Sequence, residues 1–345
     1  MLKYMHRILN QSYKTMQTPS EKTSKMLFGT EEELFNSIID INHPFRRVTE
    51  IVDFESLAGP MRSCYSTLGV HGIDVERGVK ALLIQFWESY SDREMEKAIR
   101  ENISVRWFCG FGLMEPTPDY SYFSKLRKRI GTKRIANMFK SINSILESHG
   151  LFGNVFTFID ASSIITKTAL WEERDKAIKD GEEKLNNSNV NKYASDRDAR
   201  WGAKSKHNIW FGYKRHEAVD MRYGLVKKLA VTPANVPDFN TVKSICPKEG
   251  AVFADKIYDN KKTNNIFKGK GIHVSTIKKN SNPDKNKDLD RWRSKTRMPF
   301  ENTFSKVEKR ARYRGQTKVL FQCFIEAIVH NLKKAVVFIP DPIAS

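Results

Sequence analysis

The chain has few cysteines: four in 345 residues, with no Cys-x-x-Cys pair. Cys64, Cys109, Cys246 and Cys323 lie far apart in the sequence. This spacing argues against a zinc site, whose cysteine ligands usually come in close pairs, and against a disulfide framework. We therefore expect a protein of a reducing compartment.

Long apolar runs are also missing. The longest, residues 81–87, has about seven residues, whereas a membrane-spanning helix needs roughly 20. The first residues are partly basic but show neither the apolar segment nor the small-residue cleavage site of a secretion signal. We expect no membrane association and a cytoplasmic location.

Positive charge is abundant. The chain has 59 Lys and Arg against 40 Asp and Glu, which gives a formal net charge of +19 and a pI near 9.6. Hydrophobic residues make up 40% of the chain and include 21 Phe and 6 Trp, enough to build a core and to exclude general disorder. The charge predicts a polyanionic partner, either nucleic acid or an acidic membrane surface.

The chain divides by composition and periodicity into three parts. Residues 1–30 are polar and basic and read as a tail. Residues 31–150 show helical periodicity, with a capping box formed by Ser91 and Glu94 and a helical stop at Gly150. From residue 151 to 345 strand-like segments come first and helices last, with a charged insertion at about 172–206 that we expect to be solvated and partly mobile. The pattern predicts an α/β fold in which helices flank a mixed sheet, preceded by an all-α N-terminal domain.

Three carboxylates stand in places that suit chemistry. Asp160 interrupts an apolar strand, and a buried carboxylate is costly unless it is paired or bound to metal. Asp255 ends a short strand, at the edge of a sheet where ligands bind. Glu301 follows Pro299 in what we expect to be the first turn of a helix. Converging oxygen ligands of this kind suit Mg²⁺ or Mn²⁺, although each acid taken singly is more simply a cap or turn residue.

The third carboxylate lies in a strongly basic segment. Between Lys261 and Lys318 there are eighteen Lys and Arg against five acids, a balance of +13. An acidic site surrounded by positive charge is what two-metal phosphodiester chemistry requires, because the metals act on the reacting oxygens while cations hold the backbone.

These motifs resemble those of a known family. FIDAS around Asp160, VFADKIYD around Asp255 and RMPFENTFSKVEKRARYRG around Glu301 are similar to the DDE transposases of bacterial insertion sequences, most closely the insertion sequence five family. The helical segments SDREMEKAIREN and PTPDYSYFSKLRKRI are similar to the N-terminal domain of that family. The resemblance covers about residues 31–335.

The resemblance implies a ribonuclease H-like catalytic domain and a DNA transposase. Such an enzyme binds the terminal inverted repeats of its element and catalyses metal-dependent strand cleavage and strand transfer, in the bacterial cytoplasm at the nucleoid. Asp160, Asp255 and Glu301 would be the catalytic residues and would hold two Mg²⁺ ions, with Mn²⁺ as a substitute. Arg297 and Tyr258 match residues of the family and would contact DNA. The partners implied are the element ends, target DNA and further copies of the chain, in a homodimer or larger synaptic assembly.

Two positions depart from the pattern of the family. Ile257 stands where glycine is usual, and Glu308 stands where a basic residue is usual, with Lys309 next to it. A catalytically decayed transposase that only binds DNA is therefore the alternative. A nuclease without sequence specificity is a third reading.

Further cations are candidates for contact with DNA. The segments SDREMEKAIREN and PTPDYSYFSKLRKRI could form a helix-turn-helix whose second helix faces DNA. Alternatively, the cations of the second segment form a basic, solvent-exposed face of a helical bundle. The C-terminal arginines more plausibly bind backbone phosphate than bases. The candidate DNA-binding residues are Lys125, Arg127, Lys128, Arg129, Tyr258, Arg297, Lys309, Arg310, Arg312 and Arg314.

Overall fold

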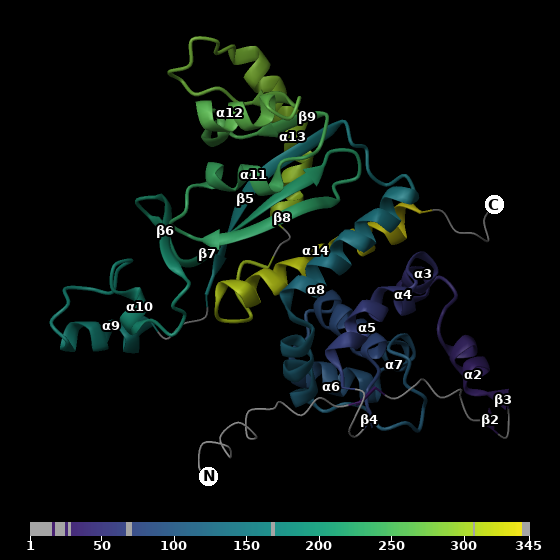
Figure 1. Cartoon of the computed structure of the whole chain (residues 1–345). Helices are drawn as coiled ribbons and strands as arrows, with labels where there is room; N and C mark the ends of the chain where they lie inside the picture. Colours follow the sequence, from purple (N-terminus) through teal and green to yellow (C-terminus); the bar gives the residue numbers. More distant parts are fainter. Residues whose placement is uncertain are drawn as a thin grey trace. The chain divides into compact units, whose positions relative to one another are not determined.

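The computed structural model describes residues 16–17, 25–26, 29–66, 71–166, 170–305 and 308–339. Most of the expected tail, residues 1–30, lies outside the described residues. The chain forms two compact units, Met1–Ser141 and Ile142–Ser345 (Figure 1). Their boundary falls inside one long helix, nine residues before the stop expected at Gly150. No helix in the described ranges combines the length and the apolar character needed to cross a membrane.

The first unit is built mainly of helices. Its core includes one face of α5, on which Val75, Val79, Leu82 and Phe86 are buried, as their spacing predicts. Short two-residue strands pair as β1 with β4 and β2 with β3, so the unit is not purely helical. Its elements are β1 (Met16–Gln17), β2 (Lys25–Met26), β3 (Gly29–Thr30), α2 (Glu31–Ile38), α3 (Pro44–Ile51), α4 (Phe54–Ala58), the 3₁₀ helix η1 (Gly59–Cys64), β4 (His71–Gly72), α5 (Val75–Trp87), α6 (Asp92–Glu101), α7 (Ile103–Phe108) and most of α8 (Tyr120–Ser148).

Local sequence signals set the helix ends in this unit. The capping box predicted for α6 is present: the Ser91 N–H donates to the Glu94 carboxylate at 2.7 Å, and the Glu94 N–H donates to the Ser91 hydroxyl at 3.3 Å. The Asp119 carboxylate caps α8 by accepting from the backbone N–H of Ser121 at 2.7 Å. Gly131, with a φ of 70°, interrupts α8, because glycine adopts this left-handed conformation without the strain of a side chain.

The second unit contains a six-stranded mixed sheet. The order of strands is β10-β9-β5-β7-β6, and β8 also pairs with β7. β7 runs antiparallel to β5, β6 and β8, whereas β5, β9 and β10 are mutually parallel. The strands are β5 (Phe156–Ile165), β6 (Arg200–Ser205), β7 (Asn208–Asp220), β8 (Val226–Pro233), β9 (Ala251–Ala254) and β10 (His273–Thr276).

Helices cover both faces of this sheet. On one face, Ile159, Ala218 and Val252 pack with residues of α11 and α12 in a buried apolar cluster. On the other face, Phe253 contacts Trp292 of α13, and Arg215 pairs with Glu326 of α14. The helices of the unit are α9 (Leu170–Lys179), α10 (Val190–Tyr193), η2 (Asp238–Thr241), α11 (Val242–Ile245), η3 (Lys256–Tyr258), α12 (Lys261–Lys268), α13 (Lys287–Ser305), α14 (Gln316–Phe338) and the end of α8.

The charged insertion expected at 172–206 is largely exposed, as predicted, but it also holds regular structure and a few buried residues. This stretch holds most of α9 together with α10 and β6, which pairs with β7. Ala177, Val190 and Ala199 are fully buried. The buried residues are small and widely spaced among charged ones, so composition alone hid their periodicity.

Candidate active site

Asp160 and Asp255 lie on neighbouring parallel strands. Ile159 of β5 is in register with Ala254 of β9, so Asp160 and Asp255 follow at adjacent positions. Side chains alternate along a strand, and both residues therefore share the sheet face that is covered by α13. The sequence predicts a strand around Asp160 and a strand end at Asp255, and the structure confirms both.

Glu301 lies on α13 and is linked to Asp255 by Arg297, which lies close to both carboxylates. Nη2 of Arg297 lies 3.5 Å from Oε1 of Glu301 and 3.9 Å from Oδ1 of Asp255. The guanidinium also lies over the Phe158 ring, 5.8 Å from its centroid. Arg297 therefore joins the second and third acids on the same face of the sheet as Asp160.

The expected helix position of Glu301 is wrong. α13 begins at Lys287, with the Asn286 side chain accepting from the N–H groups of Asp288 and Leu289 at 3.0 Å, and Glu301 lies near its other end. Pro299 is inside the helix. Proline favours a first turn because it lacks an N–H, and this preference suggested a start that the actual cap places twelve residues earlier.

The environment of Asp160 disfavours its charge. Burial raises the pKa of its carboxyl to about 6, the nearby Asp255 adds to the rise, and the Ala161 N–H, Lys204 and Arg297 oppose it. Asp160 has no ion pair within the described ranges. A half-hidden carboxylate beside a second one is a place where a divalent cation would relieve repulsion.

The three acids suit a hard divalent ion but do not form a closed cage. Within the described part of the chain, no group of three Asp, Glu, His or Cys side chains is close enough to hold a metal. Arg297 stands between Asp255 and Glu301 instead. The donors are all carboxylate oxygens, which Mg²⁺ and Mn²⁺ prefer. The set fits such an ion if Arg297 turns away from the two acids.

Tyr258 does not face solvent, so the expectation of a DNA contact there is wrong. Its side chain is fully buried in the apolar cluster beneath the sheet. Burial raises the pKa of the phenol, and the carboxylates of Asp160, Asp238 and Asp255 raise it further. Tyr258 thus packs under the site and supports the turn that follows Asp255.

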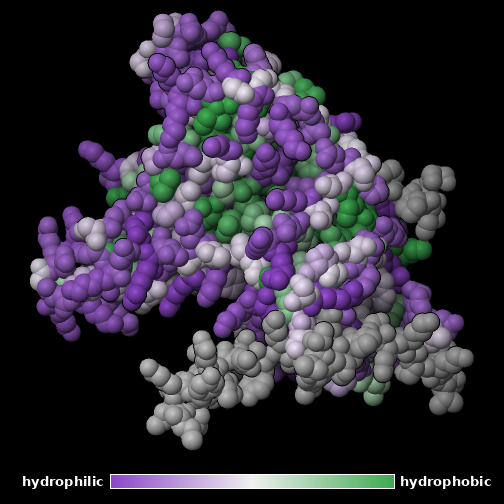
Figure 2. Space-filling view, viewed as in Figure 1, coloured by the Kyte–Doolittle hydropathy of each residue, from purple (hydrophilic) through white to green (hydrophobic). Residues whose placement is uncertain are grey.

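The C-terminal cations lie beside the end of β5. The Ile165 N–H donates to the Lys309 carbonyl at 2.7 Å, and the Ala311 N–H donates to the Ile165 carbonyl at 2.8 Å. Lys309, Arg310 and Arg314 are exposed, whereas Arg312 is half-buried. Segment 309–311 thus pairs in parallel beside the end of β5, and its exposed cations are available to a ligand. In Figure 2, hydrophilic side chains also cover the part of the unit that holds α12.

In the first unit, the four candidate cations of α8 divide into two groups. Lys125 and Lys128 are exposed. Arg127 instead forms two hydrogen bonds with the Asp92 carboxylate, at 2.8 and 2.6 Å, and the Arg129 guanidinium stacks 4.5 Å from the centroid of Tyr65. Arg127 is thus paired within the first unit, and its contact with DNA stays a prediction.

The structure does not form the helix-turn-helix that we expect from α6 and α8. Helix α7 and residues 109–119 separate α6 from α8. A helix-turn-helix joins its helices by a turn of three or four residues, so α6 and α8 do not form one.

Sequence reasoning missed the charged residues of β7. Glu217 is directly opposite Asp160 and Arg215 is opposite Ser162, so all four share one face. Arg215 and Glu217 are buried and paired at 2.6 Å, and Glu326 of α14 completes the group. The signal was present in the sequence as alternating charges within an otherwise apolar strand.

Comparison with protein-family models identifies the class of this α/β unit. Residues 152–332 match the Transposase DDE domain, which spans more than half of the chain. Residues 33–129 match a second model, the Transposase domain (DUF772). The chain belongs to the DDE transposase family and is a DNA transposase. Members of this family cleave and transfer DNA strands and generally use divalent metal ions. No solved structure matches the chain.

Proposed function

We propose that this transposase cuts and joins DNA with Asp160, Asp255 and Glu301 as the ligands of two Mg²⁺ ions. The observation that carries the proposal is the placement of Asp160 and Asp255 at adjacent positions of parallel strands, with Glu301 joined to Asp255 by Arg297. Bound divalent ions would activate the attacking water or 3′-hydroxyl and stabilise the leaving oxygen.

The sheet supports a ribonuclease H-like assignment. Strands β8, β7 and β5 form an antiparallel set, and β9 and β10 continue it in parallel with β5. This order of three antiparallel strands followed by two parallel ones is that of the ribonuclease H-like fold. The first acid then lies on the central strand and the second on its parallel neighbour.

Residues of the chain would hold the substrate around the ions. Arg297, released from the two acids, can donate to a phosphate oxygen, since a guanidinium binds phosphate through paired N–H groups. The exposed Lys309, Arg310 and Arg314 would hold the DNA backbone beyond the end of β5, with Arg312 behind them.

Recognition of the element ends is assigned to the first unit. Exposed Lys125 and Lys128 on α8 would contact phosphates there, with Arg129 behind them. The motifs favour the insertion sequence five family, two-ended cleavage in a dimer or larger assembly, and action at the bacterial nucleoid. A decayed copy that binds without cutting is the competing function, favoured by Ile257 and Glu308.

Cleavage of a labelled duplex carrying the flanking inverted repeat tests the proposal. With Mg²⁺ or Mn²⁺ the native chain is expected to nick the repeat end, and Glu301→Gln to bind equally well but cut at least about a thousandfold more slowly. Binding by both proteins without cutting by either would support the decayed copy. Cutting of duplexes that lack the repeat would indicate a general nuclease.

The two groups of α8 cations are expected to respond differently to substitution. The double variant Lys125→Gln, Lys128→Gln should make the slope of log binding constant against log salt concentration less steep by roughly 1 to 2 in a DNA titration. Each phosphate contact that is lost means that fewer counterions are released on binding. Arg127→Gln should leave that slope unchanged but cost about 1 to 2 kcal/mol in urea unfolding, since Asp92 loses two charged hydrogen bonds. A lower slope for Arg127→Gln would place this side chain on DNA.

A further inference from the structure

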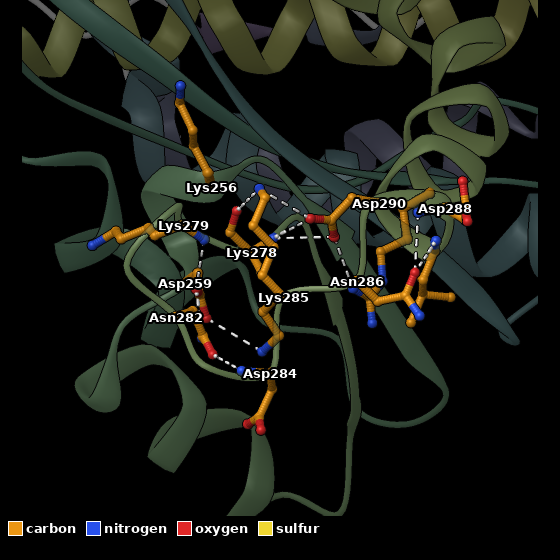
Figure 3. Close-up of polar contacts among 12 residues, drawn as sticks. Lys256, Asp259, Lys278, Lys279, Asn282, Asp284, Lys285, Asn286, Asp288 and Asp290 are labelled. Atoms are coloured by element: carbon orange, nitrogen blue, oxygen red, sulfur yellow. Dashed lines mark hydrogen bonds and ion pairs between the residues drawn. The ribbon is translucent and has the colours of Figure 1, made fainter.

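Two buried aspartates hold the loop that leads into α13. Asp259 is only 5% exposed and Asp290 only 7%, and both bind residues of the loop 277–286 (Figure 3). We name Asp259, Asp290 and this loop the clasp. The clasp lies outside the three catalytic acids, and nothing in the chemistry proposed above uses it.

Asp259 receives three hydrogen bonds from the loop. The backbone N–H of Lys279 and the side-chain amide of Asn282 each donate to Oδ2 at 3.0 Å, and the Lys278 ammonium donates to Oδ1 at 3.3 Å. Burial alone would raise the pKa of Asp259, but these donors hold it below its usual value. The carboxylate is therefore charged and saturated by the loop.

Asp290 closes the other side of the clasp. It accepts from the backbone N–H of Lys278 at 3.2 Å, from the Arg293 guanidinium at 3.0 Å and from the Lys285 ammonium at 3.4 Å. Lys278 thus binds both aspartates, one through its side chain and one through its backbone. Lys256 and Lys279 extend away from this cluster in Figure 3 and are exposed.

The position of the clasp in the chain connects the second acid to the third. Asp259 follows Asp255 by four residues, across the short helix η3, whose buried Tyr258 anchors the turn. Asp290 is in the first turn of α13, seven residues before Arg297 and eleven before Glu301. Because an α-helix is stiff, a constraint at its first turn sets where its later residues lie.

We propose that Asp259 and Asp290 are positioning residues, which set the separation of Asp255 and Glu301 through the clasp. The inference rests on the proposed function, since the separation matters only if these acids share metal ions. The remaining described contacts of α13 with the sheet and its loops include the Trp292 and Phe253 rings, 5.8 Å apart, Arg297 over Phe158, and the 3.9 Å ion pair of Arg297 with Asp255. The ring contacts tolerate sliding, whereas five hydrogen bonds and ion pairs to the two carboxylates join the loop to Asp259 and Asp290 and fix a register. Misplacement of a reacting group by about 1 Å can cost about a hundredfold in rate.

Binding of Mn²⁺ by the full chain tests the proposal. Asp259→Asn and Asp290→Asn are expected to weaken Mn²⁺ affinity by at least about tenfold relative to the native chain, measured on protein shown to be folded by circular dichroism. Asp284→Asn is the matched control: this aspartate is exposed on the same loop, and its hydrogen bond to Asn282 is donated by the backbone N–H, which the substitution keeps. It should leave the affinity unchanged. Lys278→Gln keeps the backbone donors and should give a smaller loss, so it tests the clasp if an aspartate variant fails to fold.

A second readout separates this proposal from the proposed function. Asp255→Cys with Glu301→Cys can be joined by a short bis-maleimide, because the four native cysteines are buried. Adding Asp259→Asn or Asp290→Asn should slow this cross-linking severalfold, and adding Asp284→Asn should not. Absence of Mn²⁺ binding by the native chain would contradict the metal site, and the cross-linking rate would still decide the clasp. Unchanged cross-linking in folded clasp variants, whether or not Mn²⁺ binds, would overturn the positioning role.

Discussion

Asp160→Asn is expected to stabilise the metal-free protein by about 2 to 3 kcal/mol at pH 7. Burial raises the pKa of the Asp160 carboxyl from 3.8 to about 6, so the unfolded chain ionises more readily than the folded one. Above pH 6 the folded state carries the full cost of the buried charge. Between pH 6 and 4 the cost disappears, because the folded carboxyl gains its proton first. Urea unfolding in EDTA at several pH values measures the difference.

The same substitution should remove the response to metal. Mn²⁺ or Mg²⁺ should stabilise the native chain, since an ion that binds only the folded state shifts the equilibrium towards it, and should not stabilise Asp160→Asn. Asp284→Asn, an exposed aspartate of the same unit, should match the native chain in both tests. A variant less stable than the native chain at pH 7 would show that Asp160 is paired in solution, contrary to the environment described here.

The acids could be selected from the sequence because each breaks a local pattern. Asp160 is a charge inside an apolar strand, and Asp255 directly follows a buried strand of four residues. Strand periodicity is a local property, so the two strands were predicted correctly. Their pairing is not local: the parallel register that brings Asp255 beside Asp160 joins residues 95 positions apart in the sequence, such as Ile159 and Ala254.

The start of α13 shows where local signals mislead. The sequence analysis starts the helix at Pro299, because proline favours the first turn. The structure selects Asn286, because two buried aspartates hold the preceding loop and Trp292 packs on Phe253. Tertiary contacts decided the start, and they moved Glu301 from the first turn of the helix to its last turns.

Side-chain direction was the least predictable property of the DNA-binding candidates. On α8, Lys125 and Lys128 are exposed, while Arg127 is bonded to Asp92. Lys125 and Lys128, three residues apart, lie on one face of the helix, whereas Arg127 points in another direction, and whether that direction meets an acid depends on the neighbouring helix. Tyr258 likewise follows the family motif and is buried. A motif identifies the residue, and packing decides its contacts.

Arg215→Met is expected to destabilise the protein by about 3 to 5 kcal/mol at pH 7. The side chain is 1% exposed, and its guanidinium binds Glu217 at 2.6 Å and Glu326 at 2.5 Å. Removal of the cation leaves two buried carboxylates without their partner, and breaking a buried pair in this way is far more costly than losing a surface one. Urea unfolding in EDTA measures the loss.

The pH dependence and a rescue variant identify the cause of this loss. Burial raises the pKa of Glu326, so this carboxyl gains a proton more readily than usual, and the effect of Arg215→Met should shrink as the pH falls towards 5. Adding Glu217→Gln and Glu326→Gln should recover most of the stability, because no unpaired charge then remains buried. Arg291→Met, which breaks an exposed pair with Asp288 at 3.3 Å, should cost less than about 0.5 kcal/mol. If the triple variant is no more stable than Arg215→Met alone, lost packing of the arginine side chain, and not the uncompensated charge, accounts for the effect.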